Sequence, residues 1–175
     1  MLARTHQMFG GTFGLIAILI CNLFRIIPKN ILEILIFMIF ILIGSILPDL
    51  DHPKSKLGRK VPIFSHLMYW IFGHRKVTHS LLFVGIVGVG SFLGAFILKW
   101  SFFYAFGLTL GVFSHLMGDF LTNSGIPLLY PLEKHYKCPF TFQTSGFIEK
   151  IVGLVITLLN LGLLLLMSKT GIVHF

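Results

Sequence analysis

Long apolar runs constrain this chain more than any other feature of its sequence. They cover residues 9–27, 31–47, 80–100, 102–119 and 148–167. A helix needs roughly 17 to 25 apolar residues to cross about 30 Å of hydrocarbon. Only 11% of the residues are charged and the mean hydropathy is +0.91, whereas soluble domains carry about 25% charged residues. We therefore expect an all-α polytopic membrane bundle of about five transmembrane helices, forming one domain over residues 1–175.

Prolines and short connections divide these runs. Pro28 ends the first run, and Pro48 ends the second run just where acidic residues begin. No small-residue cleavage pattern follows the first run, which favours a retained span over a removed signal peptide. Residues 61–72 are apolar and aromatic but too few to cross a bilayer, so we expect an interfacial or re-entrant helix there.

Runs three and four are joined so closely that they must be antiparallel neighbours. Each contains a pair of small residues at helical spacing, Gly90 with Gly94 and Gly107 with Gly111. Such pairs let helices approach closely in a membrane, where lipid provides no hydrophobic drive for association.

The basic residues predict an orientation. The net charge of +8 alone raises nucleic-acid binding, but in a membrane protein basic residues usually mark the cytoplasmic side and attract anionic lipid. Ten of the 14 Lys and Arg residues fall on the side of the N-terminus and four on the other. The N-terminus is predicted to be cytoplasmic. The two cysteines form no CxxC pair, so neither a disulfide nor a thiolate metal site is expected.

Histidines and acids gather on that same side of the five-span topology. They are His6 before the first run, Asp49, Asp51 and His52 after the second, His74 and His79 before the third, and His115 and Asp119 at the end of the fourth. Ionisable side chains at the depth where a span enters the membrane, as expected for His115 and Asp119, are costly unless they are paired, hydrated or bound to metal. These residues are therefore candidates for a functional site.

His115 and Asp119 are four residues apart on an expected helix, so their side chains share a face and could share an ion. The alternative is a hydrogen bond that only locks two helices together. Asp49, Asp51 and His52 combine carboxylates with imidazole, a ligand set that suits zinc, manganese or iron. The alternative for these acids is helix capping, balanced by nearby lysines. No nucleophile elbow or phosphate-binding loop accompanies them.

Several motifs in order resemble the YdjM-like family of inner-membrane proteins regarded as metal-dependent hydrolases. They read PDLDHPKS at residues 48–55, GHRKVTHSLL at 73–82, SHLMGD at 114–119 and GIPLLYP at 125–131, with a Thr-His pair at 5–6. The resemblance covers nearly the whole chain. Lys76 departs from it, because the family usually has glycine there. The resemblance implies a bacterial inner-membrane location and a fold distantly similar to zinc-dependent phospholipases C and single-strand nucleases.

The same resemblance implies a metal site. Its ligands would be His6, Asp49, Asp51, His74, His79, His115 and Asp119, with His52 in second place. Glu149 resembles a late acid of the family that approaches the site; alternatively it is an interfacial charge.

These residues predict a membrane-bound hydrolase of phosphoesters at the cytoplasmic face, acting on a lipid headgroup. The site would hold two or three divalent ions, zinc above all, with manganese or iron as alternatives. Asp119 would act at the reaction centre, Asp51 would bridge ions or act as base, and Arg75 would clamp phosphate or, alternatively, anchor the loop to lipid. Two alternatives are a non-catalytic metal-binding protein, either sensor or transporter, and a scaffold for a cytoplasmic regulator. Membrane lipids are the expected partners and nucleic acid is not. The oligomeric state cannot be inferred from these features.

Overall fold

The chain folds into a helical bundle, seen here in a computed structural model that describes residues 1–26, 30–55, 57–72 and 76–170. Five long helices form it: α1 (Ala3–Leu23), α2 (Ile31–Gly44), α4 (Leu81–Leu98), α5 (Phe102–Phe120) and α6 (Phe147–Lys169). Three short elements complete it: η1 (Pro48–Asp51), α3 (Pro62–Phe72) and η2 (Val77–His79). The described residues contain no strand beyond two isolated bridges. The predicted all-α membrane bundle is confirmed.

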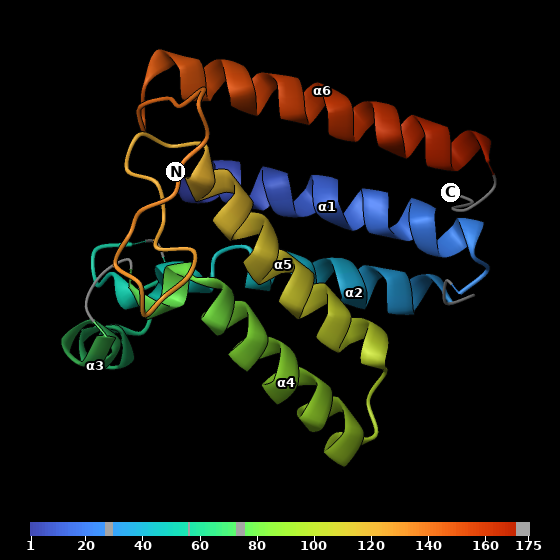
Figure 1. Cartoon of the computed structure of the whole chain (residues 1–175). Helices are drawn as coiled ribbons and strands as arrows, with labels where there is room; N and C mark the ends of the chain where they lie inside the picture. Colours follow the sequence, from blue (N-terminus) through green and yellow to red (C-terminus); the bar gives the residue numbers. More distant parts are fainter. Residues whose placement is uncertain (27–29, 56, 73–75, 171–175) are drawn as a thin grey trace.

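The long helices lie side by side, and the polar connections lie at one end. α1 packs against α2 and α6, and α5 packs against α1, α2 and α4. By length and composition, α1, α4, α6 and the segment Ile31–Asp51 could each cross a membrane. α5 is similar in length, but its last turns carry polar residues, including His115 and Asp119. Figure 1 places the N-terminus, η1, η2 and the end of α5 together at the end that we call the polar end.

α1 begins earlier than the apolar run predicts. The helix starts at Ala3, six residues before the expected position. Residues 4–7 are polar but contain neither proline nor glycine, so nothing in them interrupts a helix. The expectation that His6 precedes the first helix is therefore wrong. His6 lies in the first turns of α1, where the helix fixes the direction of its side chain.

α2 and α5 cross closely at two glycines. A Cβ on Gly111 would lie 2.2 Å from the carbonyl O of Ile41, and a Cβ on Gly44 would lie 2.2 Å from the carbonyl O of Leu108. Gly107 and Gly111 thus permit a close approach, as predicted, but to α2. A Cβ on Gly90 or Gly94 would meet no described atom within 4 Å. The prediction of close packing was wrong for that pair.

α3 matches the expected interfacial helix. Figure 1 shows it end-on at the polar end, crosswise to the long helices. It packs on η1, while Ile63 and Trp70 expose 87% and 84% of their surface. An outward apolar face beside the membrane end of a bundle is typical of a helix that lies in the interface.

The long connection after α5 folds back over the polar end. Its backbone pairs with the last turn of α5 through Cys138 N–H to Phe120 O (2.9 Å) and Phe142 N–H to Leu121 O (3.1 Å). Another bond runs from Leu81 N–H at the start of α4 to Leu128 O (3.0 Å). These bonds tie the ends of α4 and α5 together, and both ends carry or adjoin candidate ligands.

Candidate metal centre

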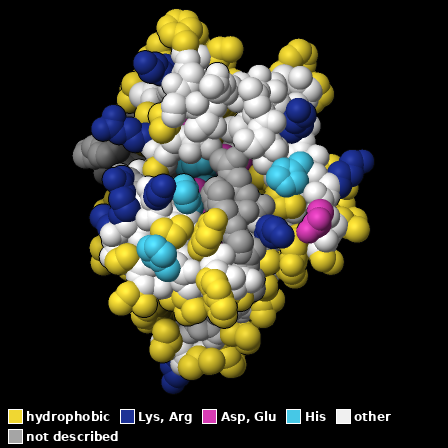
Figure 2. Space-filling view, turned by 90° about the vertical axis from the view of Figure 1, so that its left-hand side faces the viewer, with side chains coloured by type: hydrophobic (Ala, Val, Ile, Leu, Met, Phe, Trp, Pro, Cys, Tyr) yellow, Lys and Arg dark blue, Asp and Glu magenta, His cyan; other side chains and the backbone are white. Residues whose placement is uncertain are grey.

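Most of the candidate ligands meet at the polar end. The described ones are His6 of α1, Asp49 and Asp51 of η1, His79 of η2, and His115 and Asp119 of α5. All have fully buried side chains except Asp49, which is 20% exposed. Figure 2 looks onto this end: histidine and acidic side chains are visible near its middle, with Lys and Arg side chains around them. The prediction that distant segments converge is confirmed for these residues.

His79, His115 and Asp119 bring three donor atoms together. Nε2 of His115 lies 3.3 Å from Nε2 of His79. Oδ2 of Asp119 lies 3.4 Å from Nε2 of His79 and 3.7 Å from Nε2 of His115. Ligands about 2.0 to 2.1 Å from a tetrahedral zinc ion are about 3.4 Å apart, because a tetrahedron's edge is about 1.6 times its centre-to-corner distance. The three separations therefore fit a zinc ion.

A backbone carbonyl determines which nitrogen of His115 faces this group. Nδ1 lies 2.8 Å from the carbonyl O of Ser45, the residue that ends α2. A carbonyl only accepts, so Nδ1 carries the proton and donates it. In the neutral ring Nε2 then keeps its lone pair, directed toward His79 and Asp119. Histidines that bind metals usually have such a partner on the other nitrogen.

His6 stacks on His115. The ring centroids are 3.7 Å apart and the planes are 9° from parallel. Neither ring nitrogen of this buried histidine makes a hydrogen bond to another described residue; Nε2 lies 3.4 Å from Oδ1 of Asp119. A buried polar group without a hydrogen bond costs on the order of 1 to 3 kcal/mol. A cation near His6 would supply the missing partner.

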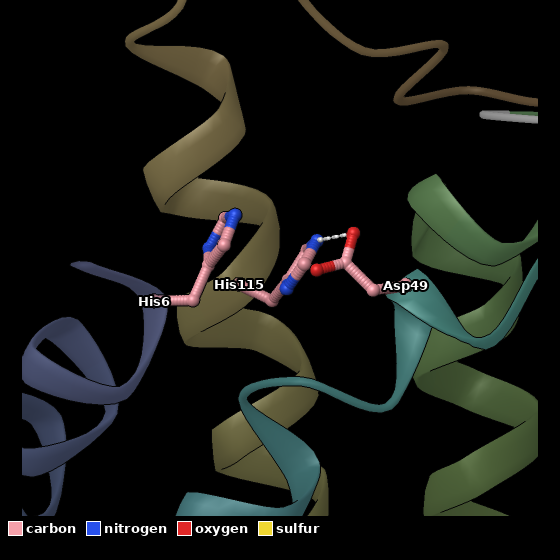
Figure 3. A group of neighbouring side chains, drawn as sticks. All are labelled: His6, Asp49 and His115. Atoms are coloured by element: carbon pink, nitrogen blue, oxygen red, sulfur yellow. Dashed lines mark ion pairs between the residues drawn. The ribbon is translucent and has the colours of Figure 1, made fainter. Parts of the chain in front are cut away.

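Asp49 completes a second group of donors with His6 and His115. One donor atom from each lies within 4.8 Å of the others, and Oδ1 of Asp49 is 3.9 Å from Nε2 of His115. Figure 3 shows the two imidazoles and this carboxylate arriving from three separate elements. The two groups share His115, whose Nδ1 is already bonded to Ser45. One lone pair binds one ion, so both groups describe the surroundings of the same position.

The surroundings of His79 favour a positive charge. Burial opposes that charge and lowers the pKa, but hydrogen bonds to Asp119 and Asp51, together with their negative charges, outweigh burial and raise the pKa of His79 from 6.5 to about 9. On the far side of the ring, Nδ1 lies 3.5 Å from Oδ2 of Asp51. Asp51 thus sits behind His79, which differs from the expected role as a bridge between ions.

Glu149 lies at the start of α6 and holds backbone groups. Its Oε1 accepts from Leu2 N–H (2.7 Å) and its Oε2 accepts from Ser145 N–H (2.5 Å). The side chain is buried, so these bonds fasten the beginning of α1 to the beginning of α6. Nearby, the amino nitrogen of Met1 is 2.5 Å from Oδ1 of Asp119. Glu149 therefore stabilises the polar end and belongs to neither donor group among the described residues.

The remaining candidates join neither donor group or are not described. His52, at the end of η1, is partly exposed and is in neither donor group that the described residues form. His74 and Arg75 lie outside the described residues. Two contributors were missed from the sequence, Ser45 and Thr78. Thr78 stands next to His79 in a recognised motif, which was a usable signal, but Ser45 acts through its backbone and gave none.

Comparison with known proteins places the chain in a family. The sequence profile of the YdjM inner membrane protein family matches residues 1–173. The chain belongs to this family. Similar proteins include the uncharacterised YvsG of Bacillus subtilis (strain 168), 39% identical over 116 residues that cover 66% of this chain and 70% of YvsG. The inner membrane proteins YdjM of Escherichia coli (strain K12) and Shigella flexneri are each 38% identical over 113 residues.

The family places the chain in the inner membrane and leaves its chemistry open. The matched region is 60% of this chain but only 54% of the two YdjM proteins, so the chain spans about half of their length. No solved structure matches the chain. The expected likeness to phospholipases C and single-strand nucleases stays a prediction.

Proposed function

We propose that this member of the YdjM family is a zinc-dependent hydrolase of phosphoesters at the membrane surface. The observation that carries the proposal is the meeting of Nε2 of His79, Nε2 of His115 and Oδ2 of Asp119 at separations of 3.3 to 3.7 Å. Two imidazoles and one carboxylate form a common ligand set of catalytic zinc, which leaves the fourth position to water or substrate.

One ion is supported better than the two or three that the family resemblance implies. His115 offers only Nε2, so the two donor groups cannot fill separate positions from that ring. A second ion would depend on Nε2 of His6 and Oδ1 of Asp119, which lie 3.4 Å apart, and it would have to displace the amino group of Met1, which lies 2.5 Å from that oxygen. Carboxylates do bridge ions in two-metal sites, where the ions are about 3.5 to 4 Å apart. Among the described acids Asp119 is thus the better bridge, and Asp51 is not.

The protein would position the zinc ion and the substrate, keep bulk water away from the ligands and supply a proton acceptor. A bound zinc ion supplies a water whose pKa is lowered to about 7. Asp49 is the one candidate acid open to the outside, with 20% exposure, so it is placed to accept a proton from an arriving water. The basic side chains around the polar end would attract an anionic substrate (Figure 2). His79, His115 and Asp119 are fully buried and keep bulk water away from their donor atoms.

Two further parts of the proposal concern place and substrate. The excess of Lys and Arg on the polar side favours a cytoplasmic location for it. A lipid headgroup is the favoured phosphoester because the donor atoms lie at the ends of the helices, which in our proposal reach the membrane interface. A substrate held in the bilayer would reach them without leaving it.

A non-catalytic metal site is the second candidate, and the burial of the ligands favours it. Structural zinc sites are closed by four protein ligands, whereas catalytic ones keep one position open. If His6 or Asp49 fills the fourth position, the ion would stabilise the bundle or act as a sensor. Replacing Asp49 separates the two candidates. If Asp49 is a structural ligand, its replacement lowers the zinc content. If Asp49 is a proton acceptor, its replacement lowers turnover and the zinc is retained.

The test is metal analysis and assay of detergent-purified protein beside matched histidine variants. His115→Ala removes a central donor, whereas His135→Ala removes an exposed loop histidine whose Nδ1 only donates to Ser124 O. We expect one zinc per chain and phosphoester turnover in the wild type and in His135→Ala, and loss of both in His115→Ala. Zinc-loaded protein that cleaves no phospholipid or soluble phosphoester would refute the hydrolase; equal zinc in all three proteins would refute the site.

A further inference from the structure

Thr78 lies at the turn that presents His79, and its hydroxyl contacts both His79 and Asp51. Oγ1 of Thr78 is 2.9 Å from Nδ1 of His79 and makes a short hydrogen bond to Oδ2 of Asp51. The three side chains are buried, with exposures of 1% or less. In this arrangement the hydroxyl stands between an imidazole and a carboxylate that are 3.5 Å apart.

The direction of these hydrogen bonds follows from the number of protons. An ionised carboxylate only accepts, so the single hydroxyl proton of Thr78 must point to Asp51. The oxygen of Thr78 then has only lone pairs to offer Nδ1 of His79. That nitrogen must carry the proton and donate it. In a neutral ring, Nε2 of His79 therefore keeps the lone pair that faces His115 and Asp119.

His79 and His115 thus share the same tautomer, with the proton on Nδ1, although different acceptors fix it. At His115 the carbonyl O of Ser45 accepts from Nδ1 and leaves Nε2 available. In both rings a local acceptor keeps the proton on the outer nitrogen, Nδ1, and the inner nitrogens, Nε2, lie 3.3 Å apart. Two lone pairs facing each other repel unless a proton or a cation lies between them.

We propose that Thr78 and Asp51 are positioning residues that fix the tautomer and ring orientation of His79 for metal binding. Asp51 orients the hydroxyl of Thr78, and Thr78 in turn holds Nδ1–H of His79. The inference rests on the proposed metal site but not on any reaction at it. Partners of this kind typically change metal affinity by about 10- to 100-fold when they are replaced.

The test compares variants that differ by one hydroxyl. Thr78→Val keeps the shape of the side chain and removes the hydroxyl, whereas Thr78→Ser keeps the hydroxyl and removes a methyl group. The probe is Zn²⁺ alone, with affinity measured by competition with a chromophoric chelator in detergent. We expect Thr78→Val to weaken zinc binding about 10- to 100-fold and Thr78→Ser to stay within about threefold of the wild type. Nitrogen-15 NMR of the histidine rings should show that His79 loses its Nδ1–H preference in Thr78→Val and keeps it in Thr78→Ser.

Two additional variants test the role of Asp51 and the metal site itself. Asp51→Asn retains size and loses the charge that orients Thr78, so it should weaken zinc binding in the same direction; it replaces Thr78→Val if that variant does not fold. Thr78→Val and Asp51→Asn that bind zinc as tightly as the wild type would overturn the positioning role. His79→Ala identifies which idea has failed. If it still binds zinc like the wild type, the metal site itself is wrong; if it loses zinc while Thr78→Val does not, only the positioning role is wrong.

Discussion

Nε2 of His79 and Nε2 of His115 lie 3.3 Å apart although the two residues are 36 positions apart in the chain. The outer nitrogen of each ring has its own acceptor, Thr78 for His79 and the carbonyl O of Ser45 for His115, so in neutral rings both Nε2 atoms carry lone pairs. A cation between them resolves the repulsion of their lone pairs, and Asp119 supplies the negative charge for it. The same place can hold a proton or a metal ion, which gives the first prediction.

Zinc binding is expected to release a proton from His79. The pKa of this group is about 9 in the folded, ion-free protein and about 6.5 in an unfolded chain. Because the folded value is the higher one, protonation stabilises the ion-free fold fully below about pH 6.5, and this contribution is lost as pH rises through about 9. Between these values zinc must displace the proton.

Calorimetry in two buffers of different ionisation enthalpy measures this release. We expect about one proton per zinc near pH 7.5, from the group whose pKa is about 9, and less above about pH 9.5. The wild type above about pH 9.5 is its own control, since most of its His79 has already lost the proton there. Proton release at pH 7.5 that does not exceed the release at the higher pH would contradict the prediction.

The crossing of α2 and α5 gives a prediction about stability. Gly111→Ala would place a Cβ 2.2 Å from the carbonyl O of Ile41. The backbone of α2 cannot move aside as a flexible side chain can, so we expect a loss of about 1 to 3 kcal/mol in the free energy of unfolding.

Gly90→Ala is the matched control, because a Cβ there meets no described atom within 4 Å. It should be neutral or slightly stabilising, as alanine favours helix over glycine by up to about 1 kcal/mol. Unfolding in graded detergent mixtures compares the two; equal stabilities would show that α2 and α5 do not cross at Gly111.

The sequence predicted the helices and the place of the site, but not the pairings that shape it. Apolar runs and prolines located the spans, and the alternation of sides brought His6, Asp49 and His115 to one end. Sequence patterns cannot reveal which non-adjacent helices touch, so Gly44 was overlooked and the pair Gly90 and Gly94 was overvalued. Hydrogen bonds such as that from His115 to Ser45 depend on backbone positions that only folding creates. Distinguishing a candidate metal ligand from a residue that lies behind it, as for Asp51 behind His79, therefore required the three-dimensional structure.

A polar clamp inside the bundle joins α1 to α6. Thr12 Oγ1 donates to Asn160 Oδ1 (2.7 Å), and Asn160 Nδ2 donates to the carbonyl O of Met8 (3.2 Å). Side-chain hydrogen bonds between membrane helices are each worth about 0.6 kcal/mol on average and at most about 1.7. Asn160→Leu should lower the free energy of unfolding by about 1 to 2 kcal/mol and leave zinc content unchanged. Ser168→Ala is the control, since that exposed hydroxyl bonds only within α6. An unchanged stability in Asn160→Leu would mean that the hydrogen bonds of Asn160 add nothing to the packing of α6 on α1.

The two tryptophans provide a test of orientation, because they lie at opposite ends of α4. Trp70 is on α3 at the polar end and Trp100 follows the other end of α4. Their side chains are 84% and 55% exposed, so a cysteine at either position would be open to labelling. The excess of Lys and Arg predicts a cytoplasmic polar end. In a background with Cys21 and Cys138 replaced by serine, Trp100→Cys should therefore react with an impermeant maleimide in intact spheroplasts. Trp70→Cys should react only after the membrane is opened. The reverse pattern would keep the fold and invert the proposed location of the metal centre. Labelling of both cysteines from the same side would contradict the arrangement of α3 and α4.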